Sequence, residues 1–115
     1  YRQPFKTASS RYQALQKEWS FLLTNKKLLM EDSNLKAWSS KSNELGVALN
    51  KLSNQPSRSN LLAAKTQLKQ FEQQFPKWMG QHKRNYSYQV KTWSNRLETL
   101  DKLLSYGERV VLKIK

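Results

Sequence analysis

The stretch from residue 61 to residue 78 reads LLAAKTQLKQFEQQFPKW. Its apolar residues recur every three or four positions, at Leu61, Ala64, Leu68, Phe71, Phe75 and Trp78. In an α-helix this spacing places the side chains on one face, whereas a half-buried strand needs alternation at every second residue. The stretch therefore predicts an amphipathic helix with its apolar face toward a partner.

The same apolar stripe occurs in three other segments of the chain. The first of these stripes consists of Phe5, Ala8, Tyr12, Leu15, Trp19 and Leu22, and the second of Leu35, Trp38, Ser42, Leu45, Leu49 and Leu52. The third consists of Tyr86, Val90, Trp93, Leu97, Leu100 and Leu104, and its Tyr86 is expected to be half buried. The chain has only three glycines and three prolines, whereas a sandwich of strands needs a turn signal every 8–12 residues. We therefore expect an all-α protein with helices over about 8–30, 34–53, 60–79 and 83–106.

Polar or helix-breaking residues separate these segments. The first two breaks are predicted at residues 31–34 and in the polar, proline-containing loop 53–60. A Ser or Asn side chain caps a helix by accepting a hydrogen bond from a free backbone N–H, and we expect such caps at Ser33 or Asn34 and at Ser59 or Asn60. The third break is predicted at Pro76 and Gly80, because proline lacks an amide hydrogen and disfavours a helical residue before it.

Three arrangements of the chain would bury these four apolar stripes. The favoured one is an up-down four-helix bundle with short loops, the common solution at this size. A long antiparallel hairpin of residues 5–52 and 60–115, or a three-helix, spectrin-like bundle, would also bury the stripes. The tail, residues 107–115, either extends the last helix or forms a short β-like arm.

Length and composition indicate one helical domain over residues 1–115, a size at which roughly 60–70% of the unfolded surface is buried. The chain begins at Tyr1 rather than Met, so we expect it to be part of a longer protein. It has no run of 18 apolar residues, the length that a membrane-spanning helix needs. It has no cysteine and hence no disulfide framework. The compartment stays open, with the cytoplasm favoured.

The inventory of catalytic groups is thin. The chain has one histidine, His82, and eight scattered carboxylates, so neither a metal-ligand cluster nor a general base with a partner is indicated. Glu98 and Asp101 are better explained as helical partners of nearby bases. No glycine-rich phosphate loop is present. We expect no enzyme activity, no cofactor, no metal and no small-molecule substrate.

The net charge of this sequence is its most unusual property, because it is strongly positive. Lys and Arg number 21 against 8 acidic residues, a formal charge of +13, which attracts polyanions and anionic surfaces. Basic and aromatic residues are densest between residues 76 and 93, where cations would neutralise phosphates and aromatic rings could stack on unpaired bases. Tyr88 lies off the apolar stripe and should point outward, on one helical face with Arg84, Lys91 and Asn95. The predicted binding residues are Lys77, Lys83, Arg84, Tyr88, Lys91 and Arg96.

Three functions compete for this basic surface. The favoured one is binding to nucleic acid through phosphate contacts, without sequence readout, because no base-reading motif is present. The second is protein–protein interaction or self-association, either with an acidic protein or through heptad faces. The third is association with an anionic membrane surface.

Overall fold

The computed structural model describes residues 3–24, 26–80, 84 and 86–112. This part of the chain contains four long α-helices and no strand. The helices are α1 (Gln3–Leu23), α3 (Ser33–Asn54), α4 (Arg58–Met79) and α5 (Ser87–Gly107). A short helix, α2 (Lys26–Glu31), lies between α1 and α3, and a π-helical turn, η2 (Glu108–Leu112), continues α5.

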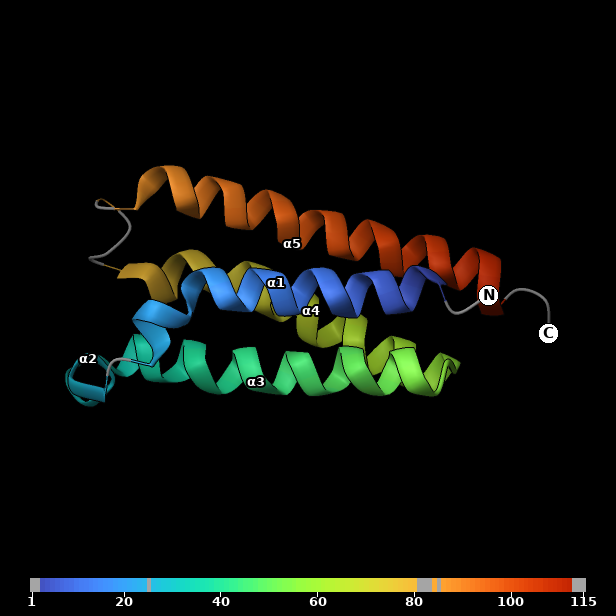
Figure 1. Ribbon diagram of the computed structural model, residues 1–115, viewed down its shortest axis with the longest axis horizontal. Coiled ribbons are helices and arrows are strands. Elements are labelled where there is room, and N and C mark those ends of the chain that lie inside the picture. Colours follow the sequence, from blue (N-terminus) through green and yellow to red (C-terminus); the bar gives the residue numbers. More distant parts are fainter. Residues whose placement is uncertain (1–2, 25, 81–83, 85, 113–115) are drawn as a thin grey trace.

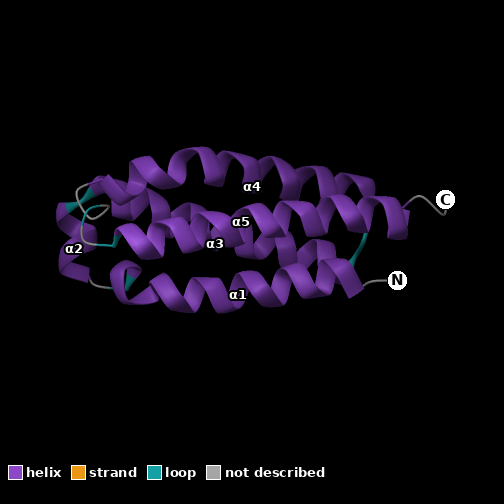
Figure 2. Ribbon diagram, turned by 90° about the horizontal axis from the view of Figure 1, so that it is seen from above, coloured by secondary structure: helices purple, strands orange, loops and turns teal. Residues whose placement is uncertain are grey.

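The long helices form an up-down bundle (Figure 1). Helix α1 packs against α3 and α5, and α4 packs against the same two helices, so that α1 and α4 lie diagonally opposite. Each long helix runs antiparallel to the next, and the bundle measures 48 × 24 × 20 Å. Figure 2 shows the same layout from above, with α2 at the end away from both chain termini. The four-helix bundle is confirmed, and the hairpin and three-helix alternatives are wrong.

An aromatic layer joins all four helices near the α2 end. It contains Trp19 of α1, Trp38 of α3, Phe75 of α4 and Trp93 of α5, and the Trp19 ring lies 5.3, 5.8 and 5.8 Å from the other three. Offset and edge-to-face aromatic contacts at such distances add to the stabilisation from burial. Along each helix, every stripe residue whose side chain is described is buried, apart from the half-buried Tyr86. The predicted stripes are therefore the core.

A buried polar cluster lies beside the aromatic layer, around Ser42. The Tyr12 hydroxyl donates to the Ser42 carbonyl at 2.6 Å, the Gln16 amide donates to Ser42 Oγ at 3.0 Å, and Trp19 Nε1 donates to the same Oγ at 3.3 Å. Burial raises the pKa of the Tyr12 hydroxyl, and its hydrogen bond to Ser42 opposes this shift only in part. Tyr12 therefore stays neutral, and the cluster fixes the register of α1 against α3.

Helix ends differ from the sequence-based prediction at several places. The first helix begins at Gln3 rather than residue 8, because Pro4 is compatible with a first helical turn. It ends at Leu23 rather than running to residue 30, and the hydroxyls of Ser20 and Thr24 bond to backbone carbonyls in its last turn.

Two predicted caps are also wrong. Asp32, not Ser33 or Asn34, caps α3, and its carboxylate accepts hydrogen bonds from the N–H groups of residues 34 and 35. Ser57, not Ser59 or Asn60, caps α4 by accepting from the N–H of residue 60. In both loops the cap lies earlier, because the helix begins as soon as its first N–H groups have an acceptor.

Pro76 does not break α4, which continues to Met79. The residues around the proline, Phe75 and Trp78, are buried in the core and hold this turn in the helix. Gly80, with φ of +46°, ends it, because this left-handed backbone conformation favours glycine.

The last helix begins at Ser87 rather than residue 83, and the described part of the tail, up to residue 112, continues as η2 rather than as a β-like arm. At this junction Gly107 is buried against Phe5 of α1. A Cβ atom on Gly107 would lie 2.4 Å from Phe5 Cε1, so the two helices approach here more closely than any side chain allows.

The substitution Ser42→Ala should lower the free energy of unfolding by about 1–3 kcal/mol, because Trp19 Nε1 loses its acceptor while remaining buried. Urea denaturation followed by circular dichroism measures the change. Ser40→Ala is the matched control, since Ser40 is exposed on the same helix, and it should alter stability by less than about 0.5 kcal/mol. Equal stability of the two variants would contradict a stabilising role for the Ser42 cluster.

The substitution Gly107→Ala should destabilise the bundle by about 1–3 kcal/mol, because the buried Phe5 ring must move to admit the new methyl group. Gly46→Ala is the control within α3, where a Cβ atom would meet its nearest neighbours at 3.4 Å, an ordinary contact. Alanine favours a helix by about 1 kcal/mol over glycine, so this variant should be at least as stable as the parent. Thermal unfolding compares the two, and a Gly107→Ala protein that melts no lower than the parent would refute the close approach.

Candidate functional site

The structure describes five of the six predicted binding residues, and all five are exposed. Lys77 lies in the last turn of α4, Arg84 in the turn before α5, and Tyr88, Lys91 and Arg96 on α5. Tyr88 points outward as expected, with 79% of its surface accessible. Lys83 lies outside the described residues.

The predicted alignment of four residues on one helical face holds only in part. Tyr88, Lys91 and Asn95 are exposed on α5, where a spacing of three and four residues places them on one side. Arg84 precedes the first residue of α5, Ser87, and so lies in a turn instead of on the helical face. The sequence pattern missed this because the helix was expected to begin at residue 83.

Arg96 differs from the other predicted cations in having an acidic partner. Its guanidinium forms an ion pair with the Glu18 carboxylate across the seam between α1 and α5. Arg96, one of the predicted binding residues, is therefore partly neutralised by Glu18. A groove of about 310 Å³ follows the same seam and is lined by Arg11, Ala14, Leu15, Arg96, Thr99 and Leu100.

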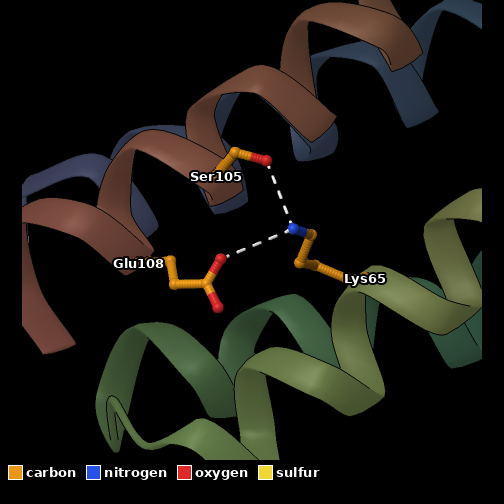
Figure 3. A network of polar contacts seen from close by, with 3 residues as sticks. All are labelled: Lys65, Ser105 and Glu108. Carbon is orange, nitrogen blue, oxygen red and sulfur yellow. Dashed lines mark hydrogen bonds and ion pairs between the residues drawn. The ribbon is translucent and has the colours of Figure 1, made fainter. Parts of the chain in front are cut away.

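Other ion pairs of the described residues lie along the middle of the bundle and at its far end. Figure 3 shows Lys65 of α4 between α5 and η2, where its ammonium lies 3.2 Å from Ser105 Oγ and 3.7 Å from Glu108 Oε1. Lys41 pairs with Glu44 on α3, and Lys102 pairs with Glu98 on α5. These exposed pairs contribute little to stability, but they partly neutralise the cations that take part.

The α2 end of the bundle brings together cations from several helices. Antiparallel packing places the start of α3, the end of α4 and the start of α5 at the same end of the bundle as α2 (Figures 1 and 2). The exposed cations of this end, called the α2-end cations below, are Lys26, Lys27, Lys36, Lys77, Arg84 and Lys91. None of them is a partner in the ion pairs of the described residues.

Only two acidic residues, Glu31 and Asp32, lie in the described part of this end. Asp32 is occupied as the cap of α3. Lys36 was not among the predicted site residues, because its place at the same end of the bundle as Lys77 depends on the antiparallel packing of α3 against α4 and not on any local sequence pattern.

Acidic residues gather instead on the seam between α4 and α5. Burial raises the pKa of the Glu72 carboxyl, and the nearby carboxylates of Asp101 and Glu98 raise it further, against the opposing effect of Lys69. Glu72 Oε1 is buried and has no hydrogen-bond partner among the described residues. Charged Glu72 is therefore unfavourable in the folded state.

The described residues contain no group of three or more His, Cys, Asp or Glu side chains that could hold a metal ion. His82 lies outside the described residues. Shallow grooves run between the helices, and one of about 450 Å³ between α3 and α4 is lined mainly by glutamines, among them Gln67, Gln70, Gln73 and Gln74. Their neutral amides do not form a catalytic group of the kind that general acid–base chemistry needs.

A search of the helices in the described part found none that is both long and apolar enough to span a membrane. The sequence matches no protein-family model. No curated protein and no solved structure is significantly similar to it.

The substitution Glu72→Gln should raise the melting temperature at neutral pH, because it removes a charge that folding disfavours. The folded-state pKa lies above the unfolded value, so the folded protein binds more protons and native stability rises as the pH falls toward about 4.3, the ordinary pKa of glutamate. The gain from Glu72→Gln should accordingly shrink over that range and vanish below it. Thermal melts at several pH values measure this.

Glu44→Gln is the control for this experiment, since Glu44 is exposed and faces the opposite charge of Lys41. It should give no gain at neutral pH. A Glu72→Gln protein with the same or lower melting temperature than the parent at neutral pH would contradict the unfavourable burial of this carboxylate.

Proposed function

We propose that this protein binds nucleic acid through the backbone phosphates, without reading base sequence, and that the α2-end cations make the contacts. One observation supports the proposal above all others. These cations come from α2, α3, α4, α5 and the turn before α5, are exposed, and lie outside the ion pairs that engage Lys41, Lys65, Arg96 and Lys102. Lysine and arginine side chains in this state bind phosphates with release of the counterions condensed on the nucleic acid.

The apolar surface favours this function over assembly through helical faces. The heptad-like stripes that would pair with another chain are buried against one another inside the bundle. Among the side chains that the structure describes, the exposed large aliphatic ones are Met30, Val47 and Leu62. They lie on three different helices, a scatter that is normal for a protein surface. Charge is thus the dominant property of the exposed surface, at +13 for the whole chain.

Affinity for a labelled oligonucleotide should fall steeply with salt, because each neutralised phosphate releases counterions. Five phosphate contacts on a single strand give a slope of roughly −3.5 in a plot of log affinity against log salt. Fluorescence anisotropy over a series of salt concentrations measures the slope. Sequence should matter little, and affinity that is flat between low and physiological salt would overturn the proposal.

A charge-reversed double variant locates the contacts. Lys77→Glu with Lys91→Glu should weaken binding on all sequences and make the slope less negative by about 1.4, which corresponds to two lost contacts. Lys51→Glu with Lys6→Glu is the matched control, because it changes the net charge equally but at the other end of the bundle. Lys51, like Lys77, lies in the last turn of its helix. If both double variants bind equally, the contacts are not confined to the α2 end.

A further inference from the structure

Most of the aromatic side chains that the structure describes are buried. Trp19, Trp38 and Trp93 are at most 2% exposed, whereas Tyr88 is 79% exposed. Tyr88 lies in the first turn of α5 and has no hydrogen bond through its side chain in the described residues. Its ring thus presents an apolar face to solvent at the α2 end, where nothing in the packing of the bundle requires it.

The cations nearest to Tyr88 along the chain are Lys91 and Arg84, and both are exposed. Lys91 follows it by three residues on the same helical face, and Arg84 precedes it in the turn that leads into α5. Neither side chain takes part in the ion pairs of the described residues. A nucleotide bound at this place would find an aromatic ring for its base and positive charges for its adjoining phosphates.

Tyr106 provides a contrast within the same helix. It lies 18 residues after Tyr88, which is five turns and about 27 Å along α5, and is 50% exposed. Two cations near it are engaged, since Lys102 pairs with Glu98 and Lys65 pairs with Glu108. Arg109, three residues further on, is exposed and takes part in none of the ion pairs of the described residues. Two tyrosines thus lie on one face of one helix, and Tyr88 is the more exposed of the two and the one at the α2 end.

We propose that Tyr88 is a stacking platform for an unpaired base, so that the protein prefers single-stranded to double-stranded nucleic acid. This inference rests on the proposed function and adds the class of nucleic acid. In a duplex the base faces are covered by their neighbours, so a tyrosine ring on a convex helical surface cannot reach them. In a single strand each base exposes an aromatic face, and stacking on a side chain tolerates any sequence.

The test compares binding of the parent protein and of Tyr88→Ala to a labelled oligo-dT strand and to a duplex of equal length, by anisotropy at one salt concentration. The parent should bind the single strand more tightly. Tyr88→Ala should lose roughly 5- to 150-fold in affinity for the single strand and keep its affinity for the duplex. Tyr88→Phe, which keeps the ring, should bind like the parent.

Tyr106→Ala is the matched control and should bind both ligands like the parent. Because both tyrosines are exposed, the variants should fold normally, which a thermal melt checks. Equal weakening of Tyr88→Ala on both ligands, or no weakening on the single strand, overturns the stacking role while leaving phosphate binding intact. Failure of the parent to bind either ligand at low salt overturns the proposed function and this inference together.

Discussion

Contact among four aromatic rings, one from each long helix, is the interaction on which the rest of this bundle depends. Trp19 lies at its centre and touches Trp38, Phe75 and Trp93. Rings of this size cannot slide past one another without opening a cavity, so the layer fixes how far each helix extends toward the α2 end. Each ring lies about 6–9 Å from the end of its helix at the α2 end, given 1.5 Å per residue. The positions of the α2-end cations follow from that layer.

The hydrogen bonds of the Ser42 cluster are directional, unlike the contacts between the apolar side chains of the core. Three donors from α1 converge on one residue of α3, and a shift of one turn would leave the buried Tyr12 and Trp19 donors without these acceptors. Apolar side chains alone would tolerate such a shift at lower cost, because one leucine can replace another. A small number of buried hydrogen bonds therefore selects one register among several that hydrophobic burial permits.

The fold was largely predictable from the sequence, and the site was predictable only in part. The stripes could be found because burial repeats with the helical period, and the outward position of Tyr88 followed from the same period. The caps at Asp32 and Ser57 were missed because neighbouring polar residues compete for one role, and only the backbone path decides among them. The pairing of Arg96 with Glu18, which are 78 residues apart, depends on the packing of α1 against α5 and has no local signal.

The described chain enters and leaves the bundle at one end, where Phe5 of the first turn packs against Gly107 of the last. The α2 end lies at the opposite pole of a particle 48 Å long. A resin, dye or fusion partner joined at the first or last described residue would accordingly lie at the opposite end of the bundle from the α2-end cations. The molecule can thus be attached to a support at that end and still present the α2-end cations to solution.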